Sequence, residues 1–290
     1  MTDSNKLHTG LIGADIQSSR SPSMHMAEAK ALGLDLTYDL FDFDRIEGGA
    51  TALPKVLALV QREGYLGVNI TYPVKQAVIP LLDECSDDVR AMGACNTVVL
   101  KDGKRAGHNT DWFGFAQSFR RELSGASLER VLLLGAGGAG SAVAYALLKL
   151  GARHVAVHDV DQAKAAFFVE RFNLLAGEAV FHAAGLLEQE AGSATGLINC
   201  TPVGMSKLKG VPIQPVLLRK EMWVADVVYV PLRTELLRQA AAKGCRTMEG
   251  GGMAVFQAGE AIRLFTGKTP DFERMLKKFR EDIAAEKAAG

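Results

Sequence analysis

The sequence has 290 residues, of which 48% are hydrophobic and 23% charged, so the chain is long enough for two globular domains with separate cores. Lys and Arg together number 33, as do Asp and Glu, and this zero net charge gives no electrostatic indication of nucleic acid or an anionic membrane as a partner. The polar first residues argue against a secretory signal, and the short apolar runs argue against a membrane span. The four cysteines are scattered, which argues against a zinc site or a redox dithiol. We therefore expect a cytoplasmic protein without a bound metal, either a monomer or a homodimer, that acts on a small molecule.

The first part of the chain alternates short apolar stretches with segments of helical character. The predicted strands are 10–14, 36–43, 65–71 and 96–100. The predicted helices are 21–33, 51–63 and 73–82. Ser21 as N-cap and Pro22 at the first helical position mark the start of the first of these helices.

A polar loop at 107–111 leads into a long amphipathic helix that reaches to 123, and we expect a domain boundary there. Strand and helix then alternate through 131–134, 139–150, 154–158, 161–172, 179–182, 196–199 and 223–227. This alternation predicts a doubly wound parallel sheet with helices on both faces. Two terminal helices, 249–267 and 271–287, are expected to pack back on the first domain. The predicted division is 1–110, 111–247 and 248–290.

The segment "VLLLGAGGAGSAVAYALLKLG" contains a GxGxxG turn with glycines at 135, 137 and 140. It follows an apolar strand and opens a helix, which is the context that a dinucleotide-binding turn requires. Glycine permits the tight turn, and the helix N-terminus stabilises the negative charge of a pyrophosphate. The alternative is a glycine-rich turn without a ligand.

Asp159 lies 24 residues after Gly135, close to the distance expected for an acidic residue that binds the adenosine ribose. Its carboxylate would accept hydrogen bonds from NAD and repel the 2′-phosphate of NADP, and Lys164 is the nearest cation. We therefore predict NAD in preference to NADP. Asp161 is expected to cap the following helix, and capping is also the alternative role for Asp159.

Polar side chains follow the predicted strands of the first domain. Ser19 and Ser21 precede a helix, where two hydroxyls could hold one carboxylate, although helix capping would account for Ser21 alone. In "NITYPVK", Lys75 could be a solvated surface residue or one half of a proton-transfer pair with Asp111, which could otherwise cap the long helix.

Seven motifs occur in one order along nearly the whole chain: "SRSPSMH", "NITYPVK", "GACNTVV", "GHNTDWFGF", "GAGGAG", "NCTPVGM" and "GGMAVFQAG". In these motifs the chain resembles the shikimate dehydrogenase family, including its quinate/shikimate members. The resemblance implies an α/β fold in which an N-terminal substrate domain precedes a Rossmann-type nucleotide domain and the C-terminal helices return to the first. It implies NAD-dependent hydride transfer between shikimate and 3-dehydroshikimate, with quinate as a further substrate.

By this resemblance Lys75 is the acid/base residue, and Asp111 partners it and binds a substrate hydroxyl. The residues expected at the substrate are Ser19 and Ser21 for its carboxylate, Asn69, Thr71, Asn96 and Gln257 for its ring hydroxyls, and Tyr229 near the carboxylate end. Those expected at the cofactor are Gly135, Ala136, Gly137, Gly138, Ala139 and Asp159, with Asn199, Thr201, Met205 and Gly250 around the nicotinamide.

The sequence also departs from the family pattern. "HDVDQAK" replaces the arginine-containing turn of many NADP-linked members, and Arg233-Thr234-Glu235 replaces the usual threonine-proline, so no role is transferred to that stretch. Serine at position 21 favours shikimate over quinate. The alternative functions are a dehydrogenase for a substituted, for example amino-, shikimate and a catalytically silent NAD-binding sensor.

Overall fold

The computed structural model describes residues 6–289, which form two compact units. The first unit combines the chain up to Thr110 with the segment from Val255 onward, and the second spans Asp111–Ala254. The chain returns to the first unit within helix α9 (Gly250–Thr266). No helix in the described part of the chain is both long and apolar enough to cross a membrane.

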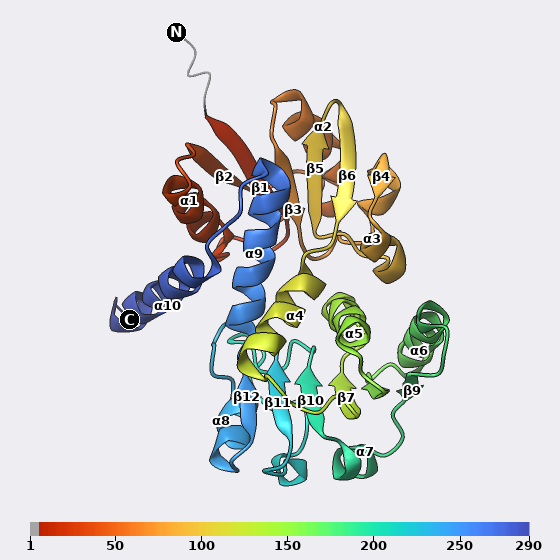
Figure 1. Cartoon of the computed structure of the whole chain (residues 1–290). Helices are drawn as coiled ribbons and strands as arrows, with labels where there is room; N and C mark the ends of the chain where they lie inside the picture. The colour runs from red at the N-terminus through yellow and green to blue at the C-terminus, as the bar shows by residue number, and fades with distance from the viewer. Residues whose placement is uncertain (1–5, 290) are drawn as a thin grey trace. The chain divides into compact units, whose positions relative to one another are not determined.

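The first unit is built on a six-stranded mixed sheet in the order β2-β1-β3-β5-β6-β4 (Figure 1). The strands are β1 (Leu7–Gly13), β2 (Leu36–Asp42), β3 (Gly67–Ile70), β4 (Glu84–Cys85), β5 (Thr97–Lys101) and β6 (Lys104–His108). β1 pairs in parallel with β2 and β3, whereas β5 is antiparallel to β3 and β6. The carboxyl ends of β1 and β3 therefore lie at the same edge of the sheet.

Helices and 3-10 turns surround this sheet. They are α1 (Ser21–Ala31), η1 (Gly49–Ala52), α2 (Leu53–Arg62), η2 (Ile79–Leu81), α3 (Asp87–Met92), the later part of α9, and α10 (Phe272–Ala289), which packs on α1. At Gly67 a Cβ would lie 2.4 Å from the Phe265 ring, so glycine lets α9 pack closely on β3. The predicted return of the terminal helices to the first domain is observed for α10 and for α9 from Val255 onward.

The predicted helix at 73–82 is wrong. The segment forms successive turns and ends in η2. Pro80 lies inside the segment, where it lacks the N–H that a helix needs and its ring clashes with the carbonyl four residues earlier. The turn conformation places Lys75 on a loop after β3 instead of on a helix.

The second unit has a six-stranded sheet in which every pairing is parallel. Its order is β9-β8-β7-β10-β11-β12, formed by β7 (Arg130–Leu134), β8 (His154–His158), β9 (Phe181–Ala183), β10 (Gly196–Asn199), β11 (Trp223–Asp226) and β12 (Arg246–Met248). This is the strand order of a Rossmann-type sheet, with the switch point between β7 and β10. The predicted α/β fold class is confirmed.

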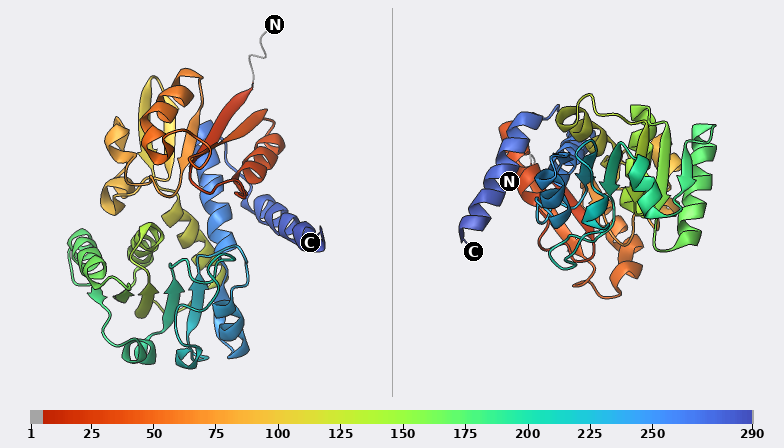
Figure 2. Two further views of the ribbon diagram at one scale, coloured as in Figure 1. Left: turned by 180° about the vertical axis from the view of Figure 1, so that it is seen from behind. Right: turned by 90° about the horizontal axis from the view of Figure 1, so that it is seen from below.

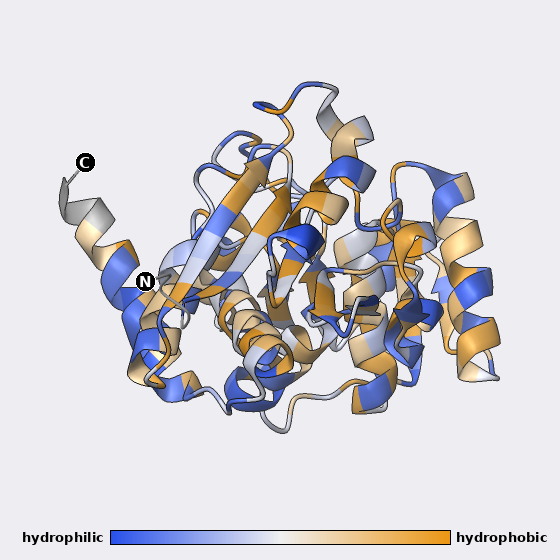
Figure 3. Cartoon of the chain, turned by 90° about the horizontal axis from the view of Figure 1, so that it is seen from above, coloured by the Kyte–Doolittle hydropathy of each residue, from blue (hydrophilic) through white to orange (hydrophobic). Residues whose placement is uncertain are grey.

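Helices cover both faces of the second sheet, as Figures 1 and 2 show. One face carries α4 (Asp111–Glu122), α5 (Gly138–Leu150) and α6 (Gln162–Ala176), and the other carries α7 (Leu187–Ser193), η3 (Pro215–Leu217) and α8 (Glu235–Ala242). Leu132, Leu133 and Leu134 are fully buried because helices cover both faces of β7. Figure 3 shows the strands largely in the hydrophobic colour and the helices with hydrophilic stretches.

Candidate active site

The glycine turn connects β7 to α5 at the switch point of the second sheet. Gly135 has a φ of +100°, and a Cβ at Gly140 would lie 2.1 Å from the Gly135 carbonyl oxygen, so both positions require glycine. A Cβ at Gly138 would meet nothing within 4 Å, and one at Gly137 would meet only Lys164 Nζ, at 3.9 Å. No side chain of the described residues caps the start of α5, which leaves space and N–H donors where a pyrophosphate would bind.

Asp159 follows β8 and is hydrogen-bonded to the glycine turn. Its Oδ2 accepts from the Ala136 N–H at 2.8 Å and from Lys164 Nζ at 3.2 Å, while its Oδ1 accepts from the Asp161 N–H at 3.1 Å. Partial burial alone would raise the pKa of Asp159, but these hydrogen bonds and the Lys164 charge lower it below its ordinary value. A stable carboxylate therefore lies beside the turn, as ribose binding requires. Asp161 caps α6 by accepting from the Lys164 N–H, as expected.

The loop after β10 begins with Asn199, which is fully buried. Its amide nitrogen donates to the Val203 carbonyl at 2.9 Å, and its Oδ1 accepts from the Thr201 hydroxyl at 2.7 Å. Asn199 therefore shapes this loop, and Met205, which is 42% exposed, lies further along it. At Gly250, the first residue of α9, a Cβ would lie 2.5 Å from the Val227 carbonyl oxygen, so glycine allows the close approach of the chain there.

In the first unit, hydrogen bonds connect three of the predicted substrate residues. Asn69 donates to Thr97 Oγ1 at 3.0 Å, and Thr97 donates to Asn96 Oδ1 at 3.0 Å. Asn96 in turn lies 3.5 Å from Gln257 Oε1, to which the Thr110 hydroxyl also donates at 3.3 Å. Residues from β3, β5, α9 and the segment before α4 thus form one polar network.

This network also fixes the backbone on either side of it. The Cys95 N–H, next to Asn96, donates to the Lys75 carbonyl at 2.8 Å, which holds the loop that carries the half-buried Lys75. The Thr110 N–H donates to Asn96 Oδ1 at 2.7 Å, directly before α4 begins at the buried Asp111. Lys75 belongs to the first unit, and Asp111 is the first residue of the second.

The remaining predicted substrate residues lie on loops or at element ends. The Ser21 N–H donates to Ser19 Oγ at 3.3 Å, so the local hydrogen bond at the start of α1 uses Ser19, and Arg20, not Ser21, is the N-cap. Thr71 lies just after β3, where its N–H donates to the Ile12 carbonyl. Tyr229 is half-exposed on the loop after β11.

Some contributing residues were given no role of their own from the sequence. Thr97 and Thr110 lie in the polar clusters Asn96-Thr97 and Asn109-Thr110-Asp111, and in the structure they link the predicted substrate residues. Thr234 lies in the stretch to which no role was transferred, but it caps α8 and donates to Asp226 at 2.7 Å. The sequence signal that could have identified it is Thr234 followed by Glu235 directly before a helical stretch.

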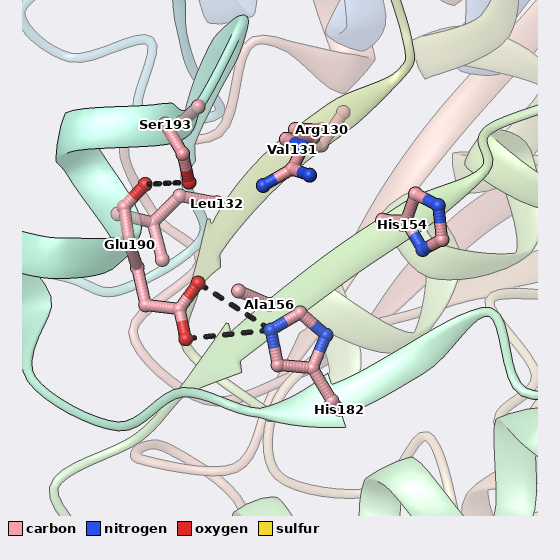
Figure 4. Close-up of a pocket in the computed structure, with 9 residues that line it drawn as sticks. Arg130, Val131, Leu132, His154, Ala156, His182, Glu190 and Ser193 are labelled. Atoms are coloured by element: carbon pink, nitrogen blue, oxygen red, sulfur yellow. Dashed lines mark hydrogen bonds and ion pairs between the residues drawn. The ribbon is translucent and has the colours of Figure 1, made fainter.

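The second unit also has a cavity of about 160 Å³, which is separate from the glycine turn (Figure 4). It is lined by Arg130, His154, His182 and Glu190, among others, at the amino ends of β7 and β8. Ligands of parallel sheets bind at the carboxyl ends, where the glycine turn is found. Within the described part of the chain, no cluster of His, Cys, Asp and Glu has the arrangement to hold a metal ion.

A Rossmann-type sheet with a glycine turn at its switch point and an acidic residue after its second strand defines a dinucleotide-binding protein, here joined to a second α/β unit with a buried polar network. Residues 11–98 match the family model described as the shikimate dehydrogenase substrate binding domain. The chain is 49% identical over 274 residues to a shikimate dehydrogenase (NADP(+)) of Streptomyces avermitilis, with 94% of each chain covered. The chain therefore belongs to the shikimate dehydrogenase family, and the resemblance seen in its motifs is confirmed.

Two further proteins show the range of relatives. A quinate/shikimate dehydrogenase (NAD(+)) of Corynebacterium efficiens is 44% identical over 275 residues, with 93% of this chain and 96% of the relative covered. The structure of quinate dehydrogenase from Corynebacterium glutamicum in complex with NAD is 40% identical, with a TM-score of 0.91 and coverage of 96% of this chain and 100% of that one. Relatives of this chain thus include both NADP-named and NAD-named enzymes.

Proposed function

We propose that this protein is an NAD-linked dehydrogenase that interconverts shikimate and 3-dehydroshikimate and also accepts quinate. The observation that carries this proposal is the network of the buried Asn69 and Asn96 with the half-buried Gln257, which brings amide groups from three separate motifs together in the first unit. Such groups suit a small molecule with several hydroxyls, because each amide can both donate and accept a hydrogen bond. Membership of the shikimate dehydrogenase family supports the same substrate class.

Preference for NAD over NADP is part of the proposal. The carboxylate of Asp159 is held at the glycine turn, where the ribose of a dinucleotide lies in Rossmann-type sheets. It can accept hydrogen bonds from the two ribose hydroxyls of NAD and repels the 2′-phosphate of NADP. Lys164 partly offsets this repulsion, because its ammonium is paired with Asp159. We therefore expect a strong but incomplete preference for NAD.

The residues of the glycine turn fit this cofactor. Gly137 and Gly138 leave the space that its pyrophosphate needs, and α5 points its first N–H groups toward that space. When bound, NAD supplies the acceptor for the hydride that leaves the carbinol carbon. The loop at Asn199 to Met205 and the chain at Gly250 are proposed to shield the nicotinamide end from water.

The protein supplies position and proton transfer. We assign Lys75 as the group that takes the hydroxyl proton during oxidation and returns it during reduction, with Asp111 as its partner and as a ligand of the substrate hydroxyl. Asn69, Thr71, Asn96 and Gln257 are proposed to orient the ring hydroxyls. Ser19 and Ser21 are proposed to hold the carboxylate, with Tyr229 near the same end of the substrate.

Four steady-state measurements test the proposal: shikimate and quinate, each with NAD and with NADP, followed at the absorbance of the reduced nicotinamide. The expected order of kcat/KM is shikimate with NAD first, with quinate and NADP both slower. Binding of NAD without turnover of either acid would overturn the proposal and favour an NAD-binding sensor. Turnover of an amino-substituted shikimate alone would show that the substrate assignment is wrong.

A further inference from the structure

Asp226 ends β11 with a carboxylate that has no exposed surface. Its Oδ1 accepts from Asn199 Nδ2 and from the Val228 N–H, both at 3.0 Å, and its Oδ2 accepts from the Thr234 hydroxyl at 2.7 Å. All three donors are neutral groups. We propose that Asp226 is a positioning residue, which together with Thr234 clamps the loop after β10 to the loop after β11 and so fixes the wall of the nicotinamide end. This inference rests on the proposed function.

The clamp acts on the loop after β10 through two contacts. Asn199 is bound to Asp226 and donates to the Val203 carbonyl, so the carboxylate orients the amide that shapes the loop. Gly204, at a φ of +106°, would place a Cβ 3.5 Å from the Thr234 side chain and 3.8 Å from Asp226 Oδ2. The loop therefore packs directly on the carboxylate and its threonine partner.

The loop after β11 is held at both of its ends. At its start the Val228 N–H donates to Asp226, and the Val227 N–H donates to the Asn199 carbonyl at 3.0 Å. At its far end the Val230 carbonyl accepts from the Ser206 N–H at 3.2 Å, which joins the two loops a second time. Tyr229 lies between these attachments, so its backbone position depends on the clamp.

If Asp226 served only the stability of the fold, a carboxylate would not be needed at the end of β11. Asn199, Asp226 and Thr234 are all fully buried, and burying a carboxylate among neutral donors is costly. Burial raises the pKa of Asp226 to about 6, against the lowering effect of its three hydrogen bonds, which is consistent with that cost. The network lies at the carboxyl ends of β10 and β11, where ligands of parallel sheets bind, and its hydrogen bonds fix loop geometry there.

The test uses Thr234→Val, which keeps the shape of the side chain but removes the hydroxyl, with Thr234→Ser as the variant that restores it. Thr195→Val is the matched control, because Thr195 also hydrogen-bonds to backbone in the second unit but lies at the amino end of β10. Three quantities are measured: amide hydrogen exchange in 200–208 and 227–231, the Kd values of NAD and ADP-ribose, and kcat with shikimate. ADP-ribose lacks the nicotinamide and so reports only on the glycine turn and Asp159.

If the clamp exists, amide exchange in both loops should be faster in Thr234→Val than in the wild type. The same variant should keep an ADP-ribose Kd within about twofold of wild type, while its kcat should fall by about tenfold or more. Thr234→Ser and Thr195→Val should both stay within about threefold of wild type in kcat. Unchanged exchange in Thr234→Val overturns the clamp, and so does an equal loss of ADP-ribose and NAD binding, which indicates general damage to the unit.

If Thr234→Val does not fold, Asp226→Leu takes its place with the same readouts and the same deciding outcomes, since leucine has a similar branched shape but neither acceptor oxygen. Failure of the proposed function is seen separately, as absence of turnover in the wild-type protein. In that case the exchange rates and the comparison of NAD with ADP-ribose still decide on the clamp.

Discussion

The Ala136 N–H donates to Asp159 Oδ2 at 2.8 Å, so the residue proposed to bind the ribose is fixed to the turn proposed to hold the pyrophosphate. The two parts of a dinucleotide site are therefore coupled before any ligand binds. A change at Asp159 is expected to act both on ribose recognition and on the geometry of the turn.

Asp159→Ala should raise the Kd of NAD by roughly 10- to 100-fold, because it removes charge-assisted hydrogen bonds to two ribose hydroxyls. The Kd of NADP should rise less, since the repulsion of its 2′-phosphate is removed at the same time. Fluorescence titration with both dinucleotides measures the two constants. Asp161→Ala is the control, because Asp161 caps α6 and should affect both cofactors alike. A larger loss for NADP than for NAD would show that the cofactor assignment is wrong.

Lys75→Ala should lower kcat by roughly 10²–10⁴ with little change in KM, because a proton-transfer group acts mainly in the transition state. Lys55→Ala, at an exposed position on α2 of the same unit, should leave kcat unchanged. Steady-state rates with shikimate and NAD are the measurement. A wild-type rate in Lys75→Ala would remove this lysine from the mechanism.

Arg274→Met should lower the free energy of unfolding by about 1–3 kcal/mol, more than Glu28→Gln does. Arg274 donates through two nitrogens to Glu28, at 2.6 and 2.9 Å, and ties α10 to α1. The Glu28 side chain is 1% exposed and the Arg274 side chain 42%. Loss of the arginine therefore leaves a buried carboxylate without its cation, whereas loss of the glutamate charge leaves an arginine that water can solvate.

Urea unfolding at neutral pH measures both variants of this pair. Arg90→Met breaks an exposed pair with Asp87 on α3 and should cost no more than about 0.5 kcal/mol. A larger destabilisation by Glu28→Gln than by Arg274→Met would show that burial of the Glu28 carboxylate does not determine the cost.

The stability of the wild-type protein relative to Asp226→Asn should fall as the pH rises from 4.5 to 7.5. The pKa of Asp226 is about 6 in the folded protein against 3.8 for an ordinary aspartate, so the folded state binds this proton more tightly. The stabilisation is therefore complete below pH 3.8 and is lost as the pH rises through about 6, and the part lost between pH 4.5 and 7.5 is on the order of 2 kcal/mol. Asparagine does not titrate, which makes the variant the reference at both pH values. A difference in unfolding free energy that grows in favour of the wild type with pH would contradict the assignment.

Much of the second unit could be predicted from the sequence because its signals are local. The strand, glycine turn and helix at 131–150 are adjacent in the chain, and the fully buried Leu132 to Leu134 already indicate a strand covered on both faces. The short elements β4, α3, β6, α7, α8 and β12 were missed or not singled out, since two to eight residues give little periodicity. The predicted helix at 73–82 was wrong because Pro73 resembles the proline of a first helical turn, whereas Pro80 interrupts a helix seven residues later.

The polar contacts within the site could be predicted only in part. The motifs indicate that Asn96 and Gln257 matter, but they are 161 residues apart, and no local pattern shows that their amides meet. The same holds for Asp226 and Thr234, which come together only when the chain after β11 turns back into α8. Local spacing identifies chemically capable residues, whereas the partners of each are set by tertiary contacts.

The first unit is discontinuous in the chain, and this has a consequence for the order of events during synthesis. Gln257, the Phe265 ring over Gly67 and the Arg274 partner of Glu28 all leave the ribosome after the entire second unit has been made. The nascent first unit therefore lacks part of the cover of its sheet while the nucleotide-binding unit can already fold. A chain that stops at residue 254 would contain a complete second unit and an unfinished first one.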